Sequence, residues 1–199
     1  RAIRKTMAPS ALSSSSIALL LLLFLAINAV PASSSWVRSA GTAGICPDAV
    51  TRLHFYFHDT VSSPGNATAE RIAGPSTFGF GALVAADDPL TEGPGIESRL
   101  VGRAQGLYAS VSKSNDPAAA ALIMALSFSF TEGAYNGSSL TVAGRNPVAQ
   151  SPRELPVVGG TGRFRLARGY ATARTAWFRS NGDAVVEYDV TVFSPPPTC

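Results

Sequence analysis

The chain has 199 residues, of which 46% are hydrophobic, and its formal net charge is +3 at pH 7. Arg1, Arg4 and Lys5 account for this excess, because the other 13 basic side chains equal the 13 acidic ones in number. The balanced charge beyond these residues removes the argument for nucleic acid binding that a basic protein would support. The length favours one domain.

The first 32 residues have the pattern of a secretory signal peptide. A basic start precedes an apolar run over residues 17–27, and small residues follow up to Ala32, where we expect cleavage. The run is too short for a bilayer span, which needs about 20 apolar residues. A signal anchor is the alternative. We therefore expect a secreted, extracellular protein with a flexible segment at 33–45, rich in Ser, Ala and Gly, and a folded domain at 46–199.

Two further features agree with secretion. Cys46 and Cys199 stand near the two ends of the expected domain, and in an oxidising compartment such a pair predicts one disulfide. Asn66 and Asn136 begin Asn-x-Ser/Thr sequons among turn-forming residues, so both are predicted glycosylation sites on surface loops.

From residue 53 onward the chain alternates apolar and polar residues in short runs, which is typical of β-strands. Pairs such as Asn136-Gly137 and Asn181-Gly182 favour tight hairpins, because both central residues can take positive φ. About eight short strands imply an all-β sandwich or an up-and-down barrel. The predicted strands are 53–58, 78–86, 100–111, 122–130, 140–142, 155–158, 164–177 and 184–192. The predicted turns are 64–66, 88–89, 115–117, 136–137, 146–147, 159–160 and 181–182.

Two of the predicted strands have unusual faces. Gly102, Ala104 and Gly106 share one face of the strand 100–111, either to leave room for a ligand or to allow tight barrel packing. The strand 122–130 is apolar on both faces, which predicts an interface between copies of the chain.

The sequence offers little redox or metal chemistry, and we expect neither a metal nor a cofactor. His54 and His58 could form a metal pair, but they lack further ligands. Residues 159–162 resemble a phosphate loop without its Lys-Ser/Thr ending and are interpreted as a tight turn. The arginines of the last third are interpreted as a solvated outer strand face, with a polyanion patch as the alternative: Arg163, Arg165, Arg168, Arg174 and Arg179.

Four segments, in matching order and spacing, resemble the plant dirigent family. They are LHFYFHD at 53–59, VGRAQGLY at 101–108, VVGGTGRF at 157–164 and ARGYA at 167–171. The resemblance spans roughly residues 46–193. It implies an eight-stranded antiparallel up-and-down β-barrel, a homotrimer, residence in the apoplast, and a disulfide that matches the Cys46–Cys199 pair.

The resemblance also implies an activity on phenols. Dirigent proteins impart stereoselectivity on the coupling of phenoxy radicals, typically from coniferyl alcohol-type monolignols to lignans, while a separate laccase or peroxidase supplies the radicals. Some relatives act instead on quinone methides. The leading hypothesis is therefore a stereochemical guide with no oxidant of its own. The alternatives are a lyase or isomerase acting on a quinone methide, and a defence-related binder of cell-wall phenolics or glycans without turnover.

Asp59 and Tyr108 are the first candidate catalytic residues. Asp59 shares strand parity with Leu53, Phe55 and Phe57, so its carboxyl is expected at the end of an apolar inner face. Desolvation would favour the protonated form, which could protonate a quinone methide. A turn-capping Asp is the alternative. Tyr108 follows the small-residue face and could stack on a phenol ring and offer its hydroxyl.

The remaining site residues come from the resemblance. Arg153 aligns with a pocket arginine that would hold a phenolic oxygen, although a surface loop position is the alternative. Thr175 matches a pocket-lining threonine, and Val186 a position that is aromatic in lignan-forming relatives. In pinoresinol-forming relatives the position of Asn146 is a second acid, so two-acid lignan cyclisation is in doubt: either one acid suffices, or the ligand differs.

Overall fold

The computed structural model describes residues 47–62, 65–74 and 79–196. All of them belong to the second of two units, residues 44–199. The expected signal peptide, the segment 33–45, Cys46 and Cys199 lie outside the described residues, so cleavage and the disulfide stay predictions. Among the residues described, no helix combines the length and hydrophobicity needed to cross a membrane.

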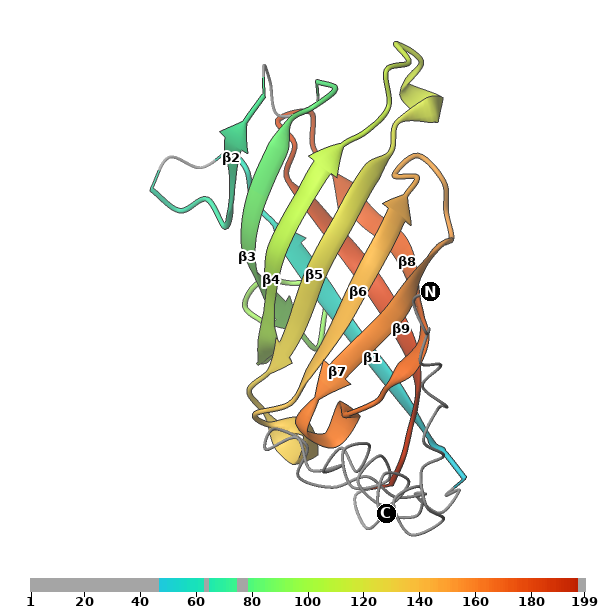
Figure 1. Cartoon of the computed structure of the whole chain (residues 1–199). Coiled ribbons are helices and arrows are strands. Elements are labelled where there is room, and N and C mark those ends of the chain that lie inside the picture. Colours follow the sequence, from blue (N-terminus) through green and yellow to red (C-terminus); the bar gives the residue numbers. More distant parts are fainter. Residues whose placement is uncertain (1–46, 63–64, 75–78, 197–199) are drawn as a thin grey trace, which may run out of the picture. The chain divides into compact units, whose positions relative to one another are not determined.

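The described part of the chain forms one closed antiparallel barrel (Figure 1). The sheet order is β1-β9-β8-β7-β6-β5-β4-β3-β2, and an additional pairing of β1 with β3 closes eight strands into a cylinder, with the short β2 alongside β3. The predicted all-β, eight-stranded antiparallel up-and-down barrel is therefore confirmed. The strands are β1 Ala49–Asp59, β2 Ala69–Ala73, β3 Leu83–Thr91, β4 Leu100–Ser110, β5 Leu122–Phe130, β6 Ser139–Asn146, β7 Arg153–Thr161, β8 Arg168–Phe178 and β9 Ala184–Ser194.

Aromatic side chains fill the middle of the barrel. The Phe55 ring lies 5.1 Å from that of Phe128 and 5.9 Å from that of Tyr188, and all three residues are almost fully buried. Each such side chain contributes roughly 1.5–3 kcal/mol on burial. Nearer one end, the Tyr135 and Phe164 rings stack at 4.9 Å. These two residues end the short 3-10 helices η2, Gly133–Tyr135, and η3, Gly162–Phe164, at the lower end of the barrel in Figure 1.

The predicted turn at Asp88-Pro89 is wrong, because both residues lie inside β3. Asp88 pairs with Ala104 and Pro89 with Arg103 of β4. On the side away from β4, β3 pairs first with β2 and then with β1, and Pro89 lies between these two pairings. The N–H that Pro89 lacks is therefore not needed for a ladder hydrogen bond there.

The chain also turns later than expected after β7. Gly159 and Gly160 belong to β7 and pair with β6, so their interpretation as a tight turn is wrong. The reversal occurs at η3 and at Leu166, which has φ of 61°, and β8 begins at Arg168. At the predicted hairpin of residues 136–137, Gly137 has φ of 77° but Asn136 has φ of −51°, so only the glycine takes positive φ.

The glycines of β4 have a packing role. A Cβ added to Gly102 or Gly106 would lie 2.3 or 2.2 Å from a carbonyl oxygen of β5. Close approach of the two strands therefore requires glycine at these positions, which favours the packing interpretation over room for a ligand.

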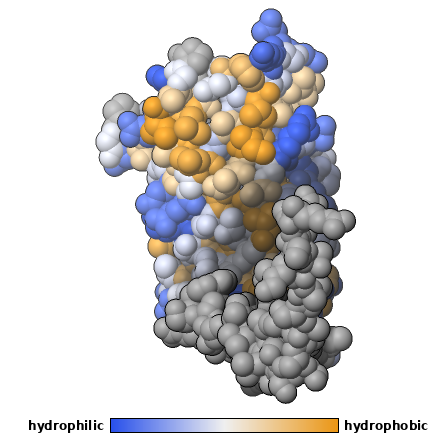
Figure 2. Space-filling model, viewed as in Figure 1, coloured by the Kyte–Doolittle hydropathy of each residue, from blue (hydrophilic) through white to orange (hydrophobic). Residues whose placement is uncertain are grey.

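An apolar area lies on the outer wall that β4 and β5 share. Leu107 is 43% exposed and Ile123 is 45% exposed on these neighbouring strands. Figure 2 shows hydrophobic side chains gathered over this part of the wall. The area is where the sequence predicts an interface between copies of the chain, which stays a prediction.

Candidate functional site

Asp59 and Tyr108 meet inside the barrel. The Tyr108 hydroxyl donates a hydrogen bond of 2.9 Å to Asp59 Oδ2, while Asp59 Oδ1 is buried without a hydrogen-bond partner. Burial raises the pKa of Asp59 to about 6; the Tyr108 hydrogen bond lowers this pKa and the charge of Asp183 raises it. A carboxyl with this pKa can exchange a proton near neutral pH.

A second polar group centres on Arg153, which is only 5% exposed. Arg153 Nε donates to Asn146 Oδ1 at 2.7 Å, and its Nη1 donates to Thr175 Oγ1 at 3.0 Å. Burial lowers the pKa of Arg153. The alternative of a surface loop arginine is therefore wrong: Arg153 is a buried strand residue, and three of the predicted site residues touch one another.

Both groups lie at one end of the barrel interior. Asp59 ends β1 and Asn146 ends β6, whereas Arg153 begins β7, and these strand ends meet because neighbouring strands are antiparallel. Asn146 Nδ2 donates to Met124 Sδ at 2.8 Å, and Met124 pairs with Tyr108 across β5 and β4.

Tyr188 lies between the two groups, deeper in the barrel. Burial raises the pKa of Tyr188 to about 12; the charge of Arg153 lowers it, and the charges of Asp59 and Asp88 raise it. The pKa of Tyr188 therefore depends on the charges of both groups. Val186, buried beside Phe57 and Thr175 in the strand register, completes this end.

Asp88 is the residue of this interior that sequence reasoning missed. Its carboxyl is fully buried; this burial raises its pKa, and the charge of Asp59 raises it further. The signal was available, since Val84, Ala86, Asp88 and Leu90 alternate with period two. The assignment of Asp88-Pro89 to a turn concealed it.

The two histidines do not form a metal pair. His58 is buried and its Nε2 lies 2.6 Å from Thr91 Oγ1, whereas His54 Nδ1 lies 2.8 Å from Asp189 Oδ1 on the outer wall. Within the described ranges, no group of three or more His, Cys, Asp or Glu side chains could hold a metal ion.

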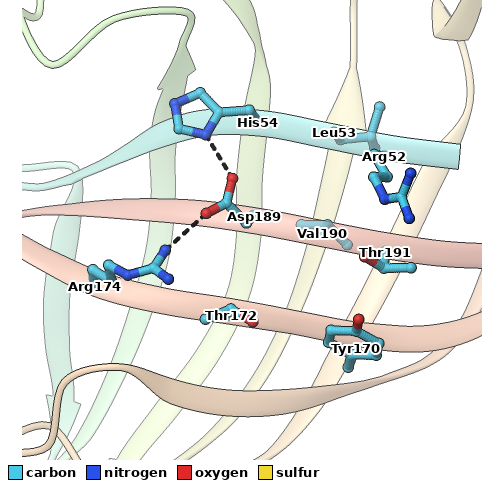
Figure 3. Close-up of a pocket in the computed structure, with 9 residues that line it drawn as sticks. All are labelled: Arg52, Leu53, His54, Tyr170, Thr172, Arg174, Asp189, Val190 and Thr191. Carbon is cyan, nitrogen blue, oxygen red and sulfur yellow. Dashed lines mark hydrogen bonds and ion pairs between the residues drawn. The ribbon is translucent and has the colours of Figure 1, made fainter.

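A hollow of about 360 Å³ lies on the outer wall of β1, β9 and β8 (Figure 3). Asp189 bridges it, with His54 on one oxygen and Arg174 Nη1 on the other at 2.8 Å. The hollow contains none of the predicted site residues, and Asp189 already binds both His54 and Arg174. The position of Arg174 agrees with a solvated outer face.

The predicted glycosylation sites are accessible. Asn66 and Asn136 are both exposed, Asn66 in a turn and Asn136 just after η2. Their occupancy stays a prediction.

Comparison with known proteins shows to which family the barrel belongs. A family model described as dirigent-like protein matches residues 50–193. The chain belongs to the dirigent family. Dirigent protein 21 of Arabidopsis thaliana is 45% identical over 81% of this chain and 86% of its own length. Pterocarpan synthase 1 of Glycyrrhiza echinata is 42% identical over 85% of this chain and 92% of its own length.

A solved dirigent structure shares the fold. The structure of the pterocarpan synthase dirigent protein GePTS1 superposes with a TM-score of 0.71 at 42% identity, covering 81% of this chain and 99% of that one. The family assignment makes a phenolic compound the partner class of this dirigent chain.

Proposed function

We propose that this dirigent protein is a non-oxidative cyclase or isomerase that closes a ring on a phenolic quinone methide. The observation that carries the proposal is the Asp59 carboxyl, whose pKa is raised to about 6 in an apolar interior that also contains the Arg153 guanidinium. A radical coupling has no proton to transfer in its bond-forming step, whereas a quinone methide gains a proton on oxygen when a nucleophile adds. The pterocarpan synthases among its relatives support this class of activity.

Each side chain has a defined part in this reaction. Asp59 donates a proton to the carbonyl oxygen of the quinone methide, and Tyr108 orients the carboxyl through its hydrogen bond. Arg153, held by Asn146 and Thr175, binds the phenolic oxygen at the other side of the site. Fixing both ends of the substrate selects one folded conformer, and thereby one product stereoisomer.

The second candidate is the orientation of two phenoxy radicals from coniferyl alcohol-type monolignols, generated by a separate laccase or peroxidase. The aromatic interior favours it, because Phe57, Tyr108 and Tyr188 give stacking surfaces for phenol rings at the same end. Arg153 would then hold a phenolic oxygen without proton transfer.

We further propose that the protein acts outside the cell, in the apoplast, as a homotrimer. The apolar run at residues 17–27 supports secretion. The exposed apolar wall of β4 and β5 supports an interface that excludes water.

One experiment separates the candidates. A bis-quinone methide, prepared chemically beforehand, is incubated with the protein in the absence of any oxidant, and the products are resolved by chiral chromatography. We expect faster ring closure with one enantiomer in excess, and loss of both with Asp59→Asn. The exposed Asp87→Asn variant is the matched control.

The parallel assay uses coniferyl alcohol with an external one-electron oxidant. If only this assay gives an enantiomeric excess, the radical guide is correct and the cyclase is wrong. If neither assay changes but a phenolic or glycan ligand raises the melting temperature, the protein is a binder without turnover.

A further inference from the structure

Asp88 faces the interior from the middle of β3 and is 0% exposed. Its neighbour Asp87 points outward, where Arg103 Nε donates to Asp87 Oδ1. Among the described residues, the buried side-chain oxygens without a hydrogen-bond partner are Asp59 Oδ1 and both oxygens of Asp88. A buried carboxyl without a close hydrogen-bond partner is costly, and such a group calls for an explanation. The Thr68 hydroxyl is near enough to lower the pKa of Asp88.

The strand register brings Asp88 to the level of Asp59. At the seam that closes the barrel, Tyr56 pairs with Thr91 and Phe57 with Leu90. If this register continued for two more residues, it would set Asp59 opposite Asp88, although the pairing itself ends at Phe57 and Leu90. The two strands separate here, because Thr68 O accepts from Asp87 N at 2.8 Å and Thr68 N donates to Thr60 O at 2.8 Å.

The surroundings of Asp88 favour a neutral carboxyl. Burial and then the charge of Asp59 raise the pKa of Asp88, to about 9, and Asp87 adds a smaller increase. Two groups lower it, the Thr68 hydroxyl and Arg103 on the outer face. The Thr68 hydroxyl already accepts from Thr60 N at 3.0 Å and donates to His58 O at 3.3 Å.

Three further groups face Asp59 or its environment. Tyr108 of β4 donates to Asp59, Asp183 acts on Asp59 as a nearby negative charge, and Tyr188 of β9 is influenced by both carboxyls. Arg153 is hydrogen-bonded to Asn146 and Thr175, so it belongs to the other group of the site. Of the charged groups around Asp88, Asp59 has the largest effect on its pKa.

We propose that Asp88 is the second acid of this site and that the two carboxyls together hold one proton, which Asp59 delivers to the substrate. Asp88 is a positioning residue in this scheme, because it acts through Asp59. It takes the part that an acid at position 146 would otherwise fill, and Asn146 is free to hold Arg153. This inference rests on the proposed ring closure.

Every proton and electron pair in the proposed step is accounted for. The shared proton passes from Asp59 to the carbonyl oxygen of the quinone methide, and the electron pair of the exocyclic C=C bond restores the aromatic ring. The substrate's own hydroxyl forms the new C–O bond at the exocyclic carbon and loses its proton to the carboxyl pair. The substrate is isomerised, and the pair regains one proton for the next turnover.

A titration of the free protein tests the sharing without any substrate. Protein labelled with carbon-13 at the aspartate carboxyls is followed by NMR, with Asp59→Asn and Asp88→Asn used for assignment. We expect the Asp88 midpoint near pH 9 to fall in Asp59→Asn, and the Asp59 midpoint near pH 6 to stay in place in Asp88→Asn. An Asp88 midpoint that ignores Asp59→Asn overturns the inference.

Kinetics give the second readout. Above pH 6 the ring-closure rate of Asp88→Asn is expected to fall about tenfold per pH unit, whereas the wild-type rate levels off until about pH 9. Asp87→Asn, the matched control one residue away, should keep the plateau above pH 6, because Asp87 adds only the smaller increase to the pKa of Asp88. Identical profiles for wild type and Asp88→Asn also overturn the inference.

The titration and the kinetics distinguish failure of the proposed function from failure of the role of Asp88. If the wild-type protein closes no ring but the carboxyls titrate as a coupled pair, the proposed function fails while the shared proton stands. If it closes rings and the carboxyls titrate independently, the proposed function stands and the role of Asp88 fails.

Discussion

Replacing Asp88 with asparagine should stabilise the barrel at neutral pH while impairing the proposed reaction. The folded protein raises the pKa of Asp88 from 3.8 to about 9, chiefly by burial. The folded state therefore keeps a proton that the unfolded chain releases above pH 3.8. Because the folded state binds more protons, the free energy of unfolding falls as the pH rises from 3.8 towards 9.

The size of the effect follows from the shift. Each pH unit in this window lowers the free energy of unfolding by about 1.4 kcal/mol, so the loss by pH 7 is of the order of 4 kcal/mol. Asparagine has the shape of the neutral carboxyl and stays uncharged at every pH. Asp88→Asn should therefore match the wild type near pH 3.5 and exceed it by on the order of 4 kcal/mol at pH 7.

Urea unfolding followed by fluorescence at several pH values, with the protein concentration held constant, measures the difference. Asp87→Asn is the control: it removes an exposed pair with Arg103, which is worth about 1 kcal/mol or less. A constant difference between Asp88→Asn and wild type across pH, or a difference that narrows as the pH rises towards 7, would refute the reasoning.

Three further predictions concern the site and the barrel. Tyr108→Phe removes a hydrogen bond that favours the charged form of Asp59, so the pKa of Asp59 should rise above 6 in an NMR titration; a fall would contradict the assigned donor. Arg153→Lys loses the geometry that reaches both Asn146 and Thr175 and should weaken phenol binding by roughly 10- to 100-fold in calorimetry, while the exposed Arg145→Lys should have no effect. Gly106→Ala places a Cβ 2.2 Å from Ala125 O and should cost about 2 kcal/mol or more in urea unfolding. Gly159→Ala meets nothing within 4 Å and should cost about 0.5 kcal/mol or less; equal losses would remove the packing role of Gly106.

The local pattern of residues predicted most of the strands. It failed where strand formation depends on the neighbouring strand. Phe55 and Asp59 lie on the inner face as the alternation of residues 53–59 predicted, because side chains alternate between the two faces of any strand. Asp88-Pro89 was misassigned, because a proline is tolerated in a strand only where its neighbour needs no donor. That condition arises from the passage of β3 from β2 to β1.

The sequence predicted which residues form the site better than it predicted which of them contact one another. Strand parity placed Asp59 inside, and family resemblance supplied Arg153, Thr175 and Val186. Neither indicated that Asn146 would bind Arg153 rather than stand alone, since the contact joins β6 to β7 through side-chain geometry.

Taken by itself, the amino-acid sequence determined the all-β class, the inward faces of the main strands and the family, because period-two alternation and short motifs are local properties of the chain. Closure of the barrel decided the rest. Pairing β1 with β3 brings Asp59 towards Asp88, which lies 29 residues later in the chain, and burial desolvates both carboxyls. Burial raises the pKa of both carboxyls, and the charge of Asp59 further raises the pKa of Asp88; neither effect exists until the cylinder is closed.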